Sequence, residues 1–276
     1  MQPAENKTVL ITGATGGLGR KVAADLASLN ATLLLHGRSP EKGKAVVREI
    51  VDATGNPKVT YYNADFSSLE KVRSLSGQVL AGNNRLDVLI NNAGIGPGSA
   101  GGEREQSRDG HELRFAVNYL SAFVLTRGLL PLLRQSVPAR VVNVASGGQQ
   151  AIDFDDVMLS HGYDGLRAYC QSKLAMVMFT FDLAEELEGT GIAVNCLHPA
   201  TLMPTSMVME TDYFTGSVDT VQQGADAVKY LALAEELDGM TGRYFNGKKP
   251  ARANAQAYDI DARRRLRELS RELAGF

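Results

Sequence analysis

Short apolar segments rich in β-branched residues alternate along the chain with longer segments in which apolar residues recur at helical spacing, such as GRKVAADLASLN from Gly19. Strands that are separated by helices predict βαβ units, whose right-handed crossovers produce a parallel, doubly wound α/β sheet. The predicted strands are TVLIT from Thr8, ATLLLHG from Ala31, KVTYYNAD from Lys58, LDVLINNAG from Leu86, ARVVNVAS from Ala139, IAVNCLHP from Ile192 and, as a candidate last strand, GRYFNG from Gly242.

The chain contains no Pro- or Ser-rich linker and no internal repeat, which predicts a single domain over residues 1–276. Three connections are longer than this arrangement requires, at about 95–108, 147–166 and 200–219. Each follows a predicted strand, and ligands bind beyond the carboxyl ends of the strands in open α/β sheets. Because long loops inside a compact domain are usually functional, we expect all three to shape a substrate site.

Charge and composition narrow the range of partners. The 29 Lys and Arg nearly balance the 31 Asp and Glu, and the net charge of −2 provides no general field for nucleic acid or an anionic membrane. We therefore expect a small-molecule partner and expect binding to neither nucleic acid nor membrane. The sequence leaves open whether the protein forms a homo-oligomer. The 44% hydrophobic content is enough for a substantial core.

The lack of a recognisable targeting signal and the small number of cysteines favour a cytoplasmic protein. The N-terminus has no long apolar run behind a basic start, and no window is expected to reach the apolar length of a membrane span. Cys170 and Cys196 have no metal-ligand spacing, and two cysteines suit a reducing compartment better than a disulfide scaffold. No metal site is predicted.

A glycine-rich turn follows the first strand. Gly13, Gly17 and Gly19 have the spacing Gly-x-x-x-Gly-x-Gly and open a helix. Such a turn lets the backbone approach a pyrophosphate, whose negative charge is favoured at a helix N-terminus. One glycine-rich turn alone would be a weak signal, but its position between strand and helix predicts nucleotide binding rather than a purely structural turn.

The end of the second strand bears on the choice of dinucleotide. NAD-binding folds usually place an acid there for the ribose hydroxyls, and LLLHGRS contains none. Arg38 and Ser39 occupy this zone, and a guanidinium suits a 2′-phosphate. We therefore predict NADP(H), with NAD(H) less favoured; the alternative is that Arg38 is simply solvated.

Three polar positions elsewhere have both ordinary and chemical interpretations. Tyr169 and Lys173, in AYCQSK, share one helix face at four-residue spacing, which chance alone often supplies. Ser146 ends the fifth strand, where a serine ordinarily caps a turn, and Asn118 is a polar residue in an apolar helix, where it would satisfy a neighbour. Spacing alone does not decide between the interpretations.

The order of four motifs along the chain decides between these interpretations. TGATGGLG, NNAG at 91–94, VNVAS at 142–146 and YCQSK resemble the marks of the short-chain dehydrogenase/reductase family, and the similarity extends from Lys7 to about Gly247. The long interval from Ser146 to Tyr169 resembles the retinol-dehydrogenase-like branch. The resemblance implies a single Rossmann-type doubly wound sheet and an NADPH-dependent carbonyl reductase or alcohol dehydrogenase. It does not identify the substrate.

The resemblance also assigns roles to residues. Tyr169 would be the proton donor, with Lys173 lowering its pKa and holding the nicotinamide ribose. Ser146 would donate a hydrogen bond to the carbonyl oxygen, and Asn118 would position a water that links Lys173 to solvent. Asp65 resembles the acid that contacts adenine, and Asn91, Ala93 and Gly94 resemble the strand-end group along the adenosine ribose; strand-end turn chemistry is the alternative for each. The predicted cofactor-binding residues are Gly13, Thr15, Gly17, Leu18, Gly19, Arg38, Ser39, Asp65, Phe66, Asn92, Ala93, Gly94, Tyr169, Lys173, Pro199 and Thr205.

Two departures from the family pattern leave the assignment standing. Ala200 occupies the usual glycine position after the sixth strand, yet Thr205 can still serve beside the nicotinamide amide. Ala145 precedes Ser146 where many relatives have a second serine. The alternatives are a non-catalytic NADP(H)-sensing regulator, which would usually lack the tyrosine or lysine, and an epimerase or dehydratase, which would usually carry a larger C-terminal domain.

Two further segments have predicted structures. The tail from Asp259 carries leucines at helical spacing (266, 269 and 273) beside a run of arginines, which predicts a docked amphipathic helix with a solvated basic face. MVMETDYF, from Met207, is either a flexible substrate lid, since methionine adapts to varied ligands, or ordinary core.

Overall fold

All seven predicted strands are present in one sheet. In the computed structural model, which describes residues 4–276, an eighth strand extends the sheet at one edge. In spatial order the strands are β3 (Val59–Asn63), β2 (Thr32–Gly37), β1 (Thr8–Ile11), β4 (Val88–Asn91), β5 (Ala139–Val144), β6 (Ile192–His198), β7 (Arg243–Asn246) and β8 (Lys249–Ala251). The first seven pair in parallel, as predicted, and β8 pairs antiparallel with β7.

The order of strands reverses between β1 and β4, so that their carboxyl ends lie side by side. This is the switch point at which open α/β sheets bind ligands. The sequence did not predict β8, because it is only three residues long and contains Pro250. A proline that cannot donate a ladder hydrogen bond is confined to an edge strand of this kind.

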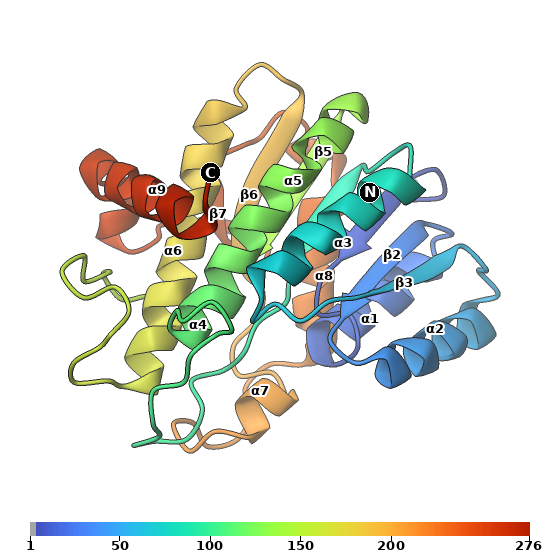
Figure 1. The fold of residues 1–276 in the computed structure, drawn as a ribbon. Helices are drawn as coiled ribbons and strands as arrows, with labels where there is room; N and C mark the ends of the chain where they lie inside the picture. Colours follow the sequence, from blue (N-terminus) through green and yellow to red (C-terminus); the bar gives the residue numbers. More distant parts are fainter. Residues whose placement is uncertain (1–3) are drawn as a thin grey trace.

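Helices cover both faces of the sheet (Figure 1). The sheet is mostly parallel and doubly wound, with one apolar cluster on each face. Successive residues of a strand point to opposite faces, so Leu10 and Leu34 belong to one cluster and Val9 and Leu33 to the other. The first face carries α3 (Leu69–Gly82), α5 (Ser121–Gln135), α6 (Gly165–Glu186) and α9 (Ile260–Ala274); the second carries α1 (Gly17–Ala27), α2 (Pro40–Thr54) and α8 (Val221–Leu233).

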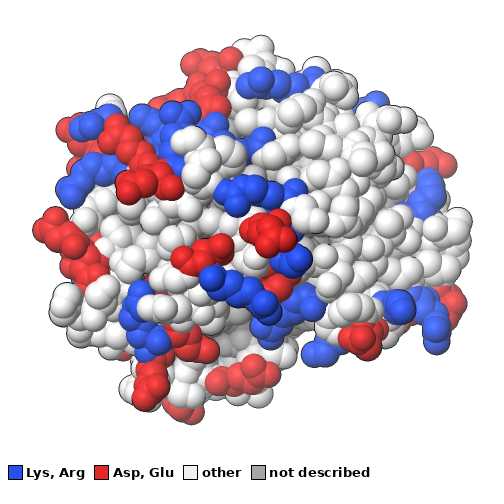
Figure 2. Space-filling view, viewed as in Figure 1, with Lys and Arg blue, Asp and Glu red and all other residues white. Residues whose placement is uncertain are grey.

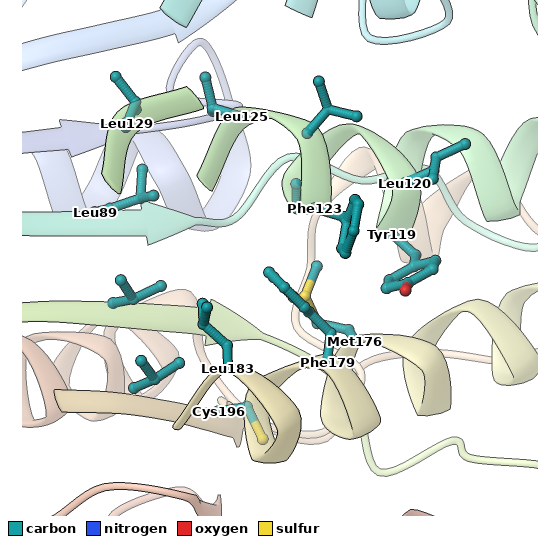
Figure 3. Packing of buried hydrophobic residues seen from close by; sticks show 14 of the residues in the cluster. Leu89, Tyr119, Leu120, Phe123, Leu125, Leu129, Met176, Phe179, Leu183 and Cys196 are labelled. Atoms are coloured by element: carbon teal, nitrogen blue, oxygen red, sulfur yellow. The ribbon is translucent and has the colours of Figure 1, made fainter. Parts of the chain in front are cut away.

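The remaining elements are short. They are α4 (Leu113–Phe115), the π-helical turn η1 (Ala116–Leu120), α7 (Ser206–Met209) and the 3-10 turns η2 (Glu235–Leu237) and η3 (Ala255–Tyr258). Tyr119 of η1 and Phe123 of α5 pack against Phe179 of α6, with ring centroids 6.3 and 5.3 Å from it (Figure 3). This aromatic cluster joins η1 and α5 to α6.

One expectation about apolar segments was wrong. The segment Leu113–Gln135, which combines α4, η1 and α5, is 23 residues long and apolar enough that by length and composition it could cross a membrane. No segment of that kind was expected from the sequence. In the structure 78% of its most apolar window is buried, because the segment packs between the sheet, α3 and α6. Its apolar character is therefore explained by core packing.

The tail forms the predicted docked helix. Leu266 of α9 is 2% exposed, and the hydroxyls of Ser270 and Tyr119 lie 2.6 Å apart in the core. The basic face is less solvated than predicted, because Arg263 is buried and donates to Glu185 (2.8 Å), while Arg267 donates to Asp182 (2.8 Å). Basic and acidic side chains are accordingly intermingled over α9 (Figure 2).

This docking predicts a measurable stability difference. Leu266→Ala should lower the free energy of unfolding by about 2–5 kcal/mol, because it leaves a cavity beneath α9. Leu269→Ala, on the same helix but only half-buried, should cost clearly less. Urea denaturation followed by far-UV circular dichroism measures both. Equal losses would show that α9 does not dock through Leu266.

Candidate active site

The turn between β1 and α1 is closed to side chains. Gly13 and Gly17 have φ of 67° and 49°, a left-handed region that favours glycine. A Cβ at Gly19 would overlap the carbonyl oxygen of Gly13, so the first turn of α1 packs directly on the backbone of the loop. Gly16, by contrast, faces open space, since a Cβ added there would have nothing within 4 Å.

These features fit a dinucleotide. The N-terminal amides of α1 lie at the switch point, and its first turn contains no acidic side chain to repel a phosphate. Leu18 is buried at 8% exposure, so any contact it makes there is through its backbone. The structure therefore places the three glycines of the motif where the prediction requires them.

The ends of β1 and β4 are tied together beside this turn. The hydroxyl of Thr12 accepts hydrogen bonds from the backbone N–H groups of Asn92 and Ala93, both at 2.9 Å. The side-chain amide of Asn92 donates to the carbonyl of Thr12 at 2.8 Å, and Asn91 is buried and donates to Asn143. For Asn91 and Asn92, therefore, the side chains hold the strand ends, which is the turn chemistry left open from the sequence.

His36 supports the turn between β1 and α1 in a purely structural role. Its Nδ1 accepts from the N–H of Gly13 at 3.4 Å, and its Nε2 donates to the carbonyl of Ala64 at 3.0 Å. The ring stacks on buried Phe66 with centroids 4.0 Å apart. Burial lowers the pKa of His36 to about 4, so the ring is neutral and both bonds persist at neutral pH. Its strand-end position was the only available signal.

The far end of the turn faces the carboxyl end of β2. A Cβ at Gly37 would lie 3.1 Å from the hydroxyl of Thr15, and Arg38 next to it is exposed. The hydroxyl of Ser39 caps α2 by accepting from the N–H of Lys42 at 3.3 Å. Arg38 is thus available to a ligand, whereas the oxygen of Ser39 is already engaged.

A second cluster lies at the carboxyl ends of β4 and β5. Lys173 donates from Nζ to the carbonyl of Val144, the last residue of β5, at 3.1 Å, and lies 5.7 Å from the ring centroid of Tyr169. A Cβ at Gly94 would lie 3.5 Å from that Nζ and 3.1 Å from Oδ1 of Asn118. Residues from η1, α6 and the strand-end motif therefore converge on Gly94.

Ser146 belongs to the same cluster. A Cβ at Gly148 would lie 3.6 Å from Oγ of Ser146 and 3.8 Å from Cε1 of Tyr169, so these two side chains lie close together beside the glycine. The carbonyl of Ser146 accepts from the hydroxyl of Tyr244 at 3.1 Å, a support that no motif indicated. The structure brings all four predicted catalytic residues together.

Burial dominates the electrostatics here. Lys173 is 3% exposed, and desolvation lowers its pKa to about 8. Burial raises the pKa of Tyr169, and the hydrogen bond with Ser146 acts in the opposite direction. The ammonium of Lys173 lies over the face of the tyrosine ring.

Asn118 lies in the π-helical turn, a feature frequent at functional sites. Its Oδ1 accepts from the N–H of Ile95 at 2.7 Å, and its Nδ2 donates to the carbonyl of Ile95 at 3.1 Å and to Oγ of Ser172 at 3.0 Å. The side-chain amide therefore holds the backbone at Ile95, beyond Gly94, and also binds the hydroxyl of Ser172. The predicted role in positioning a water remains a prediction.

The three long connections interlock above these residues. Thr211 donates to the carbonyl of Gly98 at 2.7 Å, and Tyr213 donates to Asp164 at 3.0 Å. Gly165 packs so closely on the carbonyl oxygen of Pro97 that a Cβ would overlap it. The connections thus form one wall near the N-terminus of α6.

The MVMETDYF segment covers the site and does not belong to the core. Within 200–219 only Thr211 is buried, and Met209 is 67% exposed, so the core alternative was wrong. Thr205 reaches back to the turn, since a Cβ at Gly17 would lie 3.1 Å from its Cγ2. Pro199, which precedes this connection, is buried.

A buried polar network, also unforeseen, supports the wall. Arg114 is 5% exposed and donates to the carbonyl of Gly96 at 3.2 Å and to the hydroxyl of Tyr163 at 2.8 Å. Tyr163 donates in turn to buried Glu112 at 3.2 Å. These residues come from irregular segments, where no periodicity or motif signals a contact. Within residues 4–276, no group of three or more His, Cys, Asp or Glu is placed to hold a metal.

Comparisons with known proteins agree with this geometry. A family model described as short chain dehydrogenase matches residues 7–214. Retinol dehydrogenase 13 of Mus musculus is 36% identical over 285 residues, covering 98% of this chain and 84% of that protein. Retinol dehydrogenase 11 of Homo sapiens is 36% identical over 281 residues, covering 98% and 86%.

Solved structures are similar over most of their length. A crystal structure of a protein from Mycobacterium paratuberculosis has a TM-score of 0.81 and 28% identity, covering all of this chain and 96% of that one. A short chain dehydrogenase from Escherichia coli CFT073, complexed with NADPH, has a TM-score of 0.73 and 25% identity, covering 90% and 98%.

Proposed function

The chain belongs to the short-chain dehydrogenase family, in its retinol-dehydrogenase-like branch, and from this membership we propose an NADPH-dependent carbonyl reductase that also works reversibly as an alcohol dehydrogenase. The family makes the protein an oxidoreductase acting on CH–OH and C=O groups and using a nicotinamide cofactor. The observation that carries the proposal is the position of Ser146 and Tyr169 side by side at Gly148, with Lys173 buried beside the tyrosine ring.

The protein's part in the reaction is to place a carbonyl and supply a proton. A bound nicotinamide supplies the hydride that reduces the carbonyl carbon. Ser146 donates a hydrogen bond to the carbonyl oxygen, which stabilises the negative charge that develops there. Tyr169 transfers its proton to the same oxygen, and the product is an alcohol.

Lys173 makes the proton transfer feasible. A phenol titrates near ~10, and its burial in this site raises the pKa further. A positive charge beside the ring acts in the opposite direction by stabilising the phenolate. The charge is present only while Lys173 is protonated, and its pKa of about 8 keeps it so at neutral pH.

The proposal is tested with purified protein, NADPH and a panel of activated ketones and aldehydes. Retinal belongs in the panel because the similar mammalian proteins are named retinol dehydrogenases. We expect one NADPH consumed per alcohol formed. Tight NADPH binding without turnover on any substrate would favour a regulatory protein, and a product formed without net NADPH consumption would indicate an epimerase or dehydratase.

Cofactor preference has its own prediction. Arg38→Ala should raise the KM for NADPH by about tenfold or more, the size of a lost charge-assisted hydrogen bond, and leave the KM for NADH nearly unchanged. The support is the exposed guanidinium at the end of β2, which itself carries no acid, and the NADPH bound to the similar E. coli protein. Lys44→Ala, an exposed change on α2, is the control. Equal effects on both cofactors would refute the 2′-phosphate assignment.

A further inference from the structure

A second arginine lies beside the proposed adenosine end, on a different part of the chain. Arg108 belongs to the connection between β4 and α4, and its Nε is 3.5 Å from Oδ2 of Asp65, which follows β3. The side chain of Arg108 is 72% exposed. The pair therefore sits at the rim of the molecule, accessible to a ligand.

The backbone around Arg108 is fixed in place. Its N–H donates to the carbonyl of Ser67 at 2.8 Å, and the next residue, Asp109, caps α3 by accepting from the N–H of Leu69 at 2.9 Å. The long connection is thus anchored to the β3–α3 turn at this arginine and at the residue after it. Such anchoring fixes the backbone from which the guanidinium extends.

Arg38 approaches the same carboxylate from the neighbouring strand. β2 and β3 are parallel, with Gly37 opposite Asn63, and the N–H of Ala64 donates to the carbonyl of Gly37 at 3.1 Å. The residues that follow, Arg38 and Asp65, therefore leave the sheet side by side. Burial acts to raise the pKa of Asp65, but hydrogen bonds from Ser67 and then the charges of Arg108 and Arg38 keep it below its ordinary value.

We propose that Arg108 is a second cation of the 2′-phosphate subsite and acts together with Arg38 to select NADP(H). An exposed Arg–Asp pair contributes little to the stability of a fold, so Arg108 can exchange the carboxylate for a phosphate at little cost. Its planar fork suits phosphate oxygens. The inference rests on the proposed use of NADPH and extends it to a residue that no dinucleotide motif contains.

The test measures binding of two adenosine probes by calorimetry. Arg108→Gln should weaken binding of adenosine 2′,5′-bisphosphate about five- to tenfold and leave binding of adenosine 5′-monophosphate unchanged, while Arg108→Lys should recover part of the loss. Arg104→Gln is the matched control, because Arg104 lies on the same connection but donates to Met158, away from this rim, at 2.8 Å. Thermal unfolding of each variant checks that the fold is kept.

Two outcomes would overturn the inference. Unchanged binding of both probes would leave Arg108 as a surface ion pair, and equal weakening of both would give it a role at the adenine or the fold. Failure of the proposed use of NADPH gives a different result from failure of the Arg108 proposal alone. If the wild-type protein binds both probes equally and Arg38→Ala changes neither affinity, both the NADPH assignment and the role of Arg108 are wrong. A selective effect of Arg38→Ala with none for Arg108→Gln overturns only the role of Arg108.

Discussion

A Tyr169→Phe variant should have a kcat lower by a factor of about 10²–10⁴ and should still bind NADPH as tightly as the wild-type protein. The change removes one hydroxyl, the proposed proton donor, which interacts with the side chain of Ser146. The phenyl ring keeps its packing beside Lys173, so the lysine is not disturbed. Steady-state kinetics gives the turnover, and quenching of NADPH fluorescence on titration gives the affinity.

The matched control is Tyr230→Phe, on α8 at the opposite face of the sheet. It should leave both measurements unchanged. A Tyr169→Phe variant with full turnover would exclude the tyrosine as the proton donor, whereas loss of NADPH binding would assign it a mainly structural role.

Lys173→Met is expected to inactivate the enzyme and stabilise the fold. Without the ammonium, only the hydrogen bond with Ser146 opposes the burial that raises the pKa of Tyr169, and turnover should fall by about two orders of magnitude or more. The buried ammonium also destabilises the folded state: lowering its pKa from 10.5 to about 8 corresponds to about 3 kcal/mol. Methionine has a similar length and no charge, so we expect a gain of about 1–3 kcal/mol at neutral pH, reduced by the lost bond to Val144.

The pH dependence of this gain follows from the direction of the shift. Because the pKa of Lys173 is lower in the folded state, the unfolded chain binds more protons between about pH 8 and 10.5, and wild-type stability gains from this group as the pH rises through that range. The advantage of Lys173→Met should therefore be full below pH 8 and disappear above pH 10.5. Urea denaturation across this range measures it. Lys71→Met, at an exposed position, should show no such trend, and a destabilised Lys173→Met variant would contradict the argument.

The strands and the catalytic cluster were predictable from sequence because their signals are local. Each apolar run of β1 to β7 is a signal that spans only a few residues, and so is the set of glycines at 13, 17 and 19. The parallel topology then brings Ser146 and Lys173 to one edge of the sheet. Their convergence near Gly94 and Gly148 needed no knowledge of the loops. The assignment of individual cofactor contacts remains a prediction.

What could not be predicted depends on contacts between distant segments. His36 supports Gly13 across 23 positions, and Arg114 reaches Tyr163 across 49, with no periodicity in either place. The apolar segment at Leu113–Gln135 resembles a membrane span because hydropathy does not record what packs against a helix. β8 was not predicted because three residues that include a proline are too few to show the alternating pattern of a strand.

The interlocked connections have a consequence for how the substrate range of this protein can evolve. Pro97 fits only against a glycine at position 165, and Gly98 is held by Thr211 from a third segment. Exchange of one whole connection with that of a relative would therefore disturb the other two. Single side-chain replacements on the inner surface leave these contacts intact, so new specificities in this lineage should arise by point substitution more readily than by loop transfer.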